Sequence, residues 1–178
     1  MKNNLCEKAL EFIEKIPFKP NDVIYAIVYN ACASLLNEKA VSVGNRIFQQ
    51  MPKAFLNDIV LMNSAIHMFM RFGQIEDGEQ LFEQMKHPSS HTYAIMLSGY
   101  NINEEPQKCL SFFEEMKKTN VPLSIPIALS LVGACAQIGL RSVSQGIGCQ
   151  IGHLQDDLRL KTSLIDMWVC SFTIRRFS

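Results

Sequence analysis

The sequence predicts an all-α fold, a right-handed α-solenoid of antiparallel helix pairs, on two observations. The segment Ala31–Leu35 (ACASL) recurs 103 residues later as Ala134–Ile138 (ACAQI). Between these segments, Phe48, Phe82 and Phe113 are each followed by a methionine three residues later. A period of about 30–40 residues is typical of solenoids, whose repeats are too small to fold alone and stack to share one core.

Composition agrees with this fold. The chain has 178 residues, of which 48% are hydrophobic, and this is sufficient for about four full helical repeats. Most prolines lie between the periodic segments, which favours helices over strands. We expect each repeat to be a helix A, a short turn and a helix B.

The first elements follow from their apolar spacing and their stop signals. Residues 1–21 form a partial unit with only a helix B, at 4–16, which Pro20 separates from the next helix. The first full unit spans 22–58, and its helix B ends at Pro52.

Two further full units carry the same apolar face. In unit 59–89, Gly73 fits the left-handed position that ends helix A, and helix B begins near Ile75 and stops before Pro88. Unit 90–124 repeats the face with Phe113 and Met116.

The pattern weakens toward the carboxyl end. Unit 125–157 has a helix B at 142–153 with three glycines, each costing up to ~1 kcal/mol of helix propensity. Residues 158–170 form a partial unit with only a helix A, and 171–178 are a divergent tail. Half units at both ends predict a repeat array truncated at both ends, since arrays need polar capping faces.

One position in each helix B is always small. It holds Ala9, Gly44, Gly78 and Cys109 in successive units. Small side chains let two helices approach closely, so we predict close helix contacts there.

Charge and cysteines narrow the functional classes. Seventeen basic and seventeen acidic residues give a net charge of zero, so any nucleic-acid affinity must come from a local surface. Six cysteines without a Cys-x-x-Cys pair predict reduced, buried thiols of an intracellular protein.

Targeting and membrane signals are weak. The first residues do not resemble a signal peptide, and Glu7, Glu11 and Glu14 argue against an organellar presequence. The uncharged stretch 119–140 is broken by Pro122 and Pro126, which favours a buried helix over a membrane span.

Several segments resemble one repeat family. Ser90–Tyr100 (SHTYAIMLSGY) and Cys109–Lys117 (CLSFFEEMK) resemble the standard 35-residue pentatricopeptide repeat (PPR). Unit 59–89 resembles the short variant of that repeat. Units 22–58 and 125–157 resemble the long variant with its Ala-Cys-Ala motif. The order long, short, standard, long, short is that of the PLS subclass, to which the resemblance assigns the chain.

This resemblance implies binding of single-stranded RNA, one base per repeat. In the family, the fifth residue of helix A and the last residue of the unit face the base edge, and the second residue of helix A sandwiches the base. The implied pairs are Ala26 with Asp58, Asn63 with Ser89, Ala94 with Ser124, and Leu129 with about Asp157, with Asn21 and Thr162 in the half units.

The implied RNA-facing residues differ in what they can recognise. Asn63 offers an amide donor and an acceptor and Ser89 a hydroxyl, and the family's pairing rules suggest a pyrimidine there. Ala94 and Leu129 have no hydrogen-bonding side chain, which departs from the family's pattern. We expect Asn63 and Ala94 on a concave face rather than inside the helix pairs.

Catalytic motifs do not accompany the repeats. Editing members of the subclass carry a zinc deaminase with His-x-Glu and Cys-x-x-Cys motifs, and this sequence has neither. His87 and His91 are four residues apart, but Pro88 lies between them and disfavours a metal pair. We therefore expect no catalytic residues, metal, cofactor or small-molecule substrate.

The predicted function is sequence-selective RNA binding in organellar RNA processing or modification, without a catalytic domain. A catalytic or scaffold protein is a further candidate partner, and no membrane is expected. The resemblance implies a mitochondrial location, with the cytoplasm left open because no transit peptide is visible. The alternatives are a protein–protein interaction solenoid, which the zero net charge favours, and a degenerate remnant that binds nothing.

Overall fold

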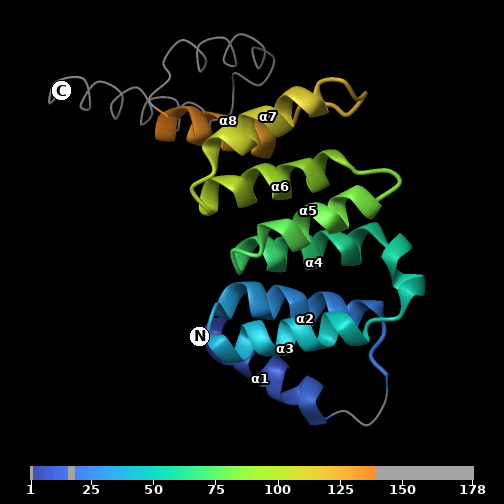
Figure 1. The fold of residues 1–178 in the computed structure, drawn as a ribbon. Helices are drawn as coiled ribbons and strands as arrows, with labels where there is room; N and C mark the ends of the chain where they lie inside the picture. Colours follow the sequence, from blue (N-terminus) through green and yellow to red (C-terminus); the bar gives the residue numbers. More distant parts are fainter. Residues whose placement is uncertain (1, 16–18, 139–178) are drawn as a thin grey trace, which may run out of the picture. The chain divides into compact units, whose positions relative to one another are not determined.

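The computed structural model describes residues 2–15 and 19–138, which fall into two compact units, Met1–Pro88 and Ser89–Ser178. The first unit contains α1 (Lys2–Lys15), α2 (Asp22–Leu35), α3 (Glu38–Gln50), the 3-10 helix η1 (Lys53–Asn57), α4 (Ile59–Arg71) and α5 (Ile75–Gln84) (Figure 1). The second contains α6 (Ser90–Ile102), α7 (Pro106–Met116) and α8 (Ile125–Ile138).

The predicted all-α fold of packed helix pairs is confirmed. In the first unit, α2 packs against α1, α3 and α4, and α4 packs against α5. In the second, α6, α7 and α8 all pack against one another. The part of the chain that the structure describes contains no strand.

Helices α2, α4, α6 and α8 correspond to the predicted helices A. They begin at the first residues of the predicted units: Asp22, Ile59, Ser90 and Ile125. The division into repeat units stays a prediction. The predicted helices at 142–153 and 158–170 and the tail at 171–178 lie outside the described residues.

The turn between α4 and α5 forms as predicted. Gly73 has a φ of 75°, in the left-handed region that glycine adopts without strain. The amide of Gln74 donates to the carbonyl of Phe69 at 3.0 Å, and that of Gly73 to the carbonyl of Met70 at 3.3 Å. These bonds satisfy carbonyls that the end of α4 leaves without helical partners, and α5 starts at Ile75.

The small position of helix B permits close packing, as predicted. A Cβ atom on Gly44 would lie 2.7 Å from Sδ of Met68 and 3.1 Å from a ring carbon of Phe72. At the equivalent Gly78, a Cβ atom would lie 3.4 Å from Cγ of Met70. The side chains of Met68 and Phe72 therefore leave less room at Gly44 than Met70 leaves at Gly78.

The cysteines are free, as predicted for the described part of the chain. Cys32, Cys109 and Cys135 are buried and Cys6 is half-buried. Burial, and secondarily the neighbouring Cys6, raises the pKa of the Cys32 thiol to about 12. Burial, and secondarily Cys135, raises the pKa of Cys109 to about 12 as well. Both side chains are therefore uncharged members of the core near neutral pH.

The short helix η1 was not predicted. It follows Pro52 and places the ring of Phe55 5.9 Å from that of Tyr25, in an edge-to-face arrangement. This contact ties the connection between α3 and α4 to the start of α2. Within residues 2–15 and 19–138, no helix combines the length and apolar character needed to cross a bilayer.

Candidate functional site

The candidate site is the first turn of each helix A, where the predicted RNA-facing residues lie. Three of these residues, Asn21, Asp58 and Ser89, immediately precede a helix A and cap it. Oδ1 of Asn21 accepts from the Ile24 amide at 2.9 Å. Caps of this kind satisfy backbone donors that the start of a helix leaves unpaired.

The other two caps are more extensive. Oδ1 of Asp58 accepts from the amides of Val60 and Leu61, at 2.9 and 3.0 Å. Oγ of Ser89 accepts from the Thr92 amide at 3.2 Å, and the Ser89 amide donates back to Oγ1 of Thr92 at 3.1 Å, which completes a capping box.

These bonds give the last residues of the units a structural role. One oxygen of each cap side chain is already used by the helix, which limits how that side chain can also read a base. Nδ2 of Asn21 and the second carboxylate oxygen of Asp58 lie outside the cap bonds. Ser124 occupies the corresponding place before α8, where its carbonyl accepts from the Ala128 amide at 3.0 Å.

The second residue of every helix A is exposed. Val23 and Val60 are 56% and 71% exposed, which is unusual for large apolar side chains. His91 and Pro126 are exposed as well. These four residues were not named as RNA-facing residues from the sequence, although each follows the predicted first residue of its unit.

The fifth residue of helix A is more buried than the second. Asn63 and Ala94 are only 7% and 6% exposed. Ala26 and Leu129 are half-buried. Because residues three apart share a helix face, each fifth residue lies beside the exposed second residue of its helix.

Asn63 has an unsatisfied polar atom. Its Oδ1 is buried and has no hydrogen-bond partner in the described part of the chain. Most buried polar atoms are hydrogen-bonded, so an exception calls for an explanation such as a missing ligand. No other fifth residue of the described helices A has a polar side chain.

The predicted pairings all stay predictions. Ala26 and Asp58 belong to the first compact unit, and Ala94 and Ser124 to the second. Asn63 and Ser89 belong to different units, so their pairing stays a prediction. Thr162 and Asp157 lie outside the described residues.

Neighbouring helices A are joined by polar side chains. Nε of Arg71 in α4 donates to the Ala33 carbonyl of α2 at 3.2 Å. In the second unit, Nδ2 of Asn101 in α6 donates to the Ser130 carbonyl of α8 at 2.5 Å. Nε2 of Gln137 in α8 donates back to the Asn101 carbonyl at 3.1 Å. These bonds fix the spacing of adjacent candidate sites.

Residues 2–15 and 19–138 contain no group of three or more histidine, cysteine, aspartate or glutamate side chains placed to hold a metal ion.

Comparison with known families identifies the repeats. One PPR repeat family model matches residues 57–101, and a second PPR repeat model matches residues 91–121. Residues 57–121 of the chain contain pentatricopeptide repeats. The matches cover α4 and α6, the two helices whose fifth residues are Asn63 and Ala94. The resemblance to PPR proteins inferred from the sequence is thus confirmed.

Curated PPR proteins of Arabidopsis thaliana are similar to the chain. One pentatricopeptide repeat-containing protein is 28% identical over 142 residues, which cover 78% of this chain and 18% of the relative. A chloroplastic one is 24% identical over 119 residues (67% and 13%). A putative mitochondrial one is 28% identical over 107 residues (60% and 17%). The chain therefore spans less than a fifth of the length of each of these PPR proteins.

Proposed function

We propose that this PPR array binds single-stranded RNA sequence-selectively and acts as a recognition module without a catalytic domain of its own. The observation that carries the proposal is the buried, unpartnered Oδ1 of Asn63. Once the Asn63 carboxamide turns toward solvent, a donor on the edge of an RNA base would supply the missing hydrogen bond, whereas a base that offers none would leave the acceptor unsatisfied.

The neighbouring Val60 supports this arrangement. Its exposed side chain lies one turn before Asn63 on the same face of α4, where an unstacked base can rest on it. Val23 occupies the same place in α2. Val23 and Val60 thus provide an apolar surface for base faces, and the fifth residues meet base edges.

The other predicted RNA-facing residues contribute less selectivity. Ala26, Ala94 and Leu129 have no polar side-chain atoms, so they accommodate a base by shape alone. The residues that immediately precede helices A take part through polar side-chain atoms that form no cap bond. These residues are Asn21, Asp58, Ser89 and Ser124. We propose that the Asn63 repeat is the main reader in the described part of the chain.

We further propose that the chain belongs to the PLS subclass and acts in organellar RNA processing or modification. The alternation of long, short and standard units supports the subclass. Relatives named both chloroplastic and mitochondrial support an organelle, and we retain the mitochondrion as the predicted compartment.

A fluorescence-anisotropy titration tests RNA binding. The chain is titrated into labelled, randomised single-stranded RNA at two salt concentrations, with Asn63→Ala beside it. Asn120→Ala, an exposed asparagine outside the helices, is the matched control. We expect salt-sensitive binding, a changed base preference in Asn63→Ala and none in Asn120→Ala.

One outcome of this titration would contradict the proposal, namely a helical, monomeric sample that binds no RNA. It would favour the second candidate, a protein-interaction solenoid, which the zero net charge and the apolar fifth residues support.

A further inference from the structure

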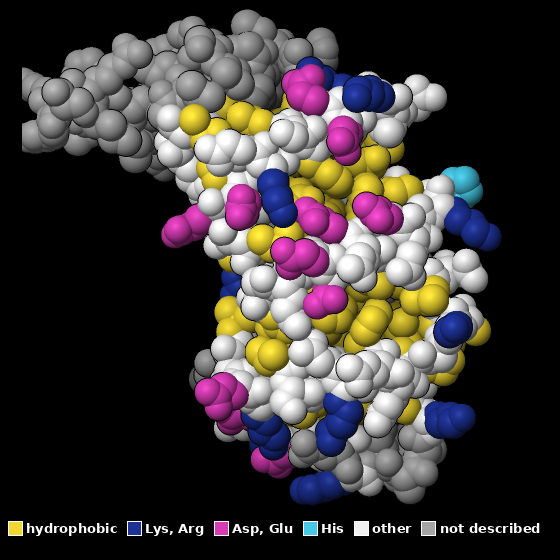
Figure 2. Space-filling model, in the orientation of Figure 1, with side chains coloured by type: hydrophobic (Ala, Val, Ile, Leu, Met, Phe, Trp, Pro, Cys, Tyr) yellow, Lys and Arg dark blue, Asp and Glu magenta, His cyan; other side chains and the backbone are white. Residues whose placement is uncertain are grey.

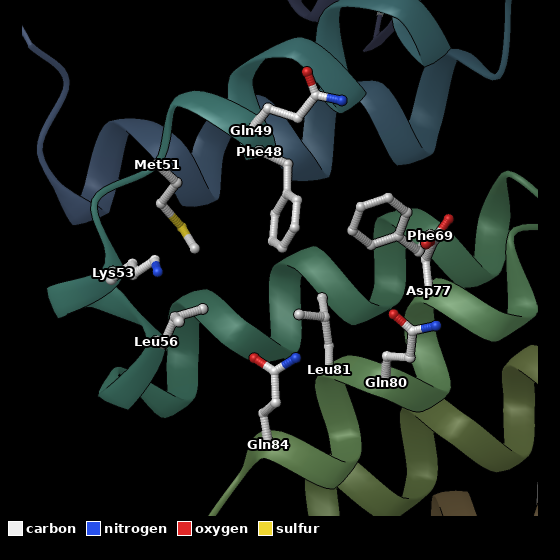
Figure 3. Close-up of a pocket in the computed structure, with 10 residues that line it drawn as sticks. All are labelled: Phe48, Gln49, Met51, Lys53, Leu56, Phe69, Asp77, Gln80, Leu81 and Gln84. Carbon is white, nitrogen blue, oxygen red and sulfur yellow. The ribbon is translucent and has the colours of Figure 1, made fainter.

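The first compact unit contains a cavity whose lining includes none of the candidate RNA-facing residues. It has a volume of about 280 Å³ and is bordered by α3, η1 and α5, with α4 behind it. Figure 3 shows the rings of Phe48 and Phe69 directed toward each other across its inner end. Their centroids are 5.0 Å apart, with the planes nearly perpendicular.

The inside of this α3–α5 pocket is apolar. Leu56 from η1, Leu81 from α5 and Met51 after α3 complete the surface that the two rings begin (Figure 3). Met51 and Leu81 are buried, so the chain's own core fixes the shape of the pocket. The space-filling view shows hydrophobic side chains gathered in a hollow between the levels of α3 and α5 (Figure 2).

The rim of the pocket is polar. The carboxamides of Gln49, Gln80 and Gln84 stand at its edge, each with donors and an acceptor. Such groups can pair with the backbone of an extended peptide. The pocket is slightly smaller than the ~300–1,000 Å³ usual for drug-sized ligands, which fits one large apolar side chain better than a cofactor.

Charge distinguishes a protein occupant from RNA. Helix α5 has acidic residues at positions 76, 77, 79 and 83 and no basic residue. Asp77 lines the pocket, and the exposed Glu76 and Glu83 lie three or four residues from Gln80, on its neighbouring surface. Lys53 is the one basic side chain that lines the pocket, on the η1 side. An acidic wall repels RNA phosphates and attracts lysine or arginine.

We propose that the α3–α5 pocket binds a large apolar side chain from a protein partner, in a segment that carries basic residues on the α5 side. The apolar side chain fills the space beneath Phe48 and Phe69 and acts as the anchor, since anchors in well-packed pockets dominate interface energies. The basic residues lie against Asp77 and Glu76. Apart from Phe69 of α4, the pocket is lined by helices B and the connection between α3 and α4, whereas the proposed RNA contacts lie at the starts of helices A, so both ligands can bind together.

Synthetic peptides test this proposal on the intact chain. One short peptide has a central phenylalanine between lysines, a second has serine in place of phenylalanine, and a third has glutamates in place of the lysines. Binding is followed by NMR of methyl-labelled methionines. Met51 reports on the pocket, and the buried Met116 of the second unit is the internal control.

We expect the phenylalanine–lysine peptide to shift the Met51 methyl signal and leave that of Met116 unchanged. The serine peptide should bind about tenfold more weakly or worse. Gln80→Trp fills the mouth of the pocket and should weaken binding to a similar degree, whereas Gln107→Trp, at an exposed position of α7, should not. Asp77→Lys should weaken the lysine peptide and strengthen the glutamate peptide, and Glu115→Lys on α7 should do neither.

Four outcomes would overturn the proposal. The serine peptide could bind as well as the phenylalanine peptide, or Gln80→Trp could leave binding unchanged. A single-stranded oligouridylate could shift the Met51 methyl signal, and Gln80→Trp could abolish that shift. This result would make the pocket a nucleic-acid site. Finally, the Met51 methyl signal could shift when only the protein concentration is raised, which would make the occupant a second copy of the chain.

Discussion

Helices α4 and α6 are the same kind of helix in the two compact units, with different chemistry at equivalent positions. Both have 13 residues, a capping side chain, an exposed second residue and a buried fifth residue. The fifth residue is Asn63 in α4 and Ala94 in α6, and their exposures are nearly equal at 7% and 6%. Only Asn63 brings a polar side chain to that place.

The comparison separates what the repeat builds from what each unit recognises. Caps and helix contacts recur because every repeat must satisfy the same helix ends and fill the same space between helices. The fifth residue is free of these demands, since asparagine and alanine are both accommodated. Recognition can therefore vary from unit to unit without altering the fold.

Exchanging the two fifth residues should have the largest effect. In the double variant Asn63→Ala/Ala94→Asn, we expect the selected base to move to the nucleotide next to the original one. Binding to the original RNA should weaken about tenfold, because one base contact contributes ~1–3 kcal/mol. Anisotropy titration against RNAs that differ at single nucleotides measures both effects. An unchanged preference in the double variant would mean that the fifth residues do not read bases.

The next comparison concerns the side chains that join helices A. Arg71 satisfies the Ala33 carbonyl, which lies in the last turn of α2 and has no helical partner there. Arg71→Ala should therefore destabilise the first unit by about 1–3 kcal/mol. Asn101→Ala should cost the second unit less than about 1 kcal/mol, because the Ser130 carbonyl lies within α8 and Oδ1 of Asn101 is itself buried without a partner.

Urea unfolding measures both losses, and Arg71→Met serves as the control that keeps apolar contacts and removes the donor. Equal losses in Arg71→Ala and Asn101→Ala would show that the position of the accepting carbonyl in its helix does not matter.

The caps of α4 and α6 should differ by a smaller amount. Asp58→Ala removes two bonds to backbone amides and a negative charge at the helix start, so we expect a loss of about 1–2 kcal/mol. Ser89→Ala removes one acceptor and should cost about 1 kcal/mol. Thermal unfolding checks the order, and Asp58→Asn, which keeps an acceptor, should recover most of the loss. A larger loss in Ser89→Ala would reverse the comparison.

The smallest effect concerns pH, and here the two units should behave alike. Burial raises the pKa of Cys32 and of Cys109 from 9.0 to about 12, so the thiolates form first in the unfolded chain. Stability from these thiols is complete below pH 9 and is lost as the pH rises from 9 toward 12. At pH 9.5 the loss is still below about 1 kcal/mol per thiol.

Urea unfolding at pH 8 and pH 9.5 measures this loss. Cys32→Ala and Cys109→Ala should each remove the part of the pH dependence that comes from the substituted thiol, and the part from the buried Cys135 should remain in the second unit. A variant with the same pH dependence as the original chain would mean that its thiol does not titrate on unfolding.

Local sequence patterns predicted the helix boundaries well because helix ends depend on few neighbouring residues. Gly73 predicted both the end of α4 and the start of α5, since its left-handed conformation stops a helix wherever it occurs. The small residues Gly44 and Gly78 predicted close helix contacts from their recurrence alone. The helix η1 was missed because Lys53–Asn57 has no apolar period and is held by the contact of Phe55 with Tyr25.

The sequence by itself determined the α-helices and their pairing, because these follow from residue periodicity and helix-end chemistry. The positions implied to face RNA came from the resemblance to PPR proteins. Tertiary structure decided the burial of Asn63 and the α3–α5 pocket. Helical periodicity tells which side of a helix a residue occupies. How deeply it is buried depends on side chains from other helices, and only packing brings those together.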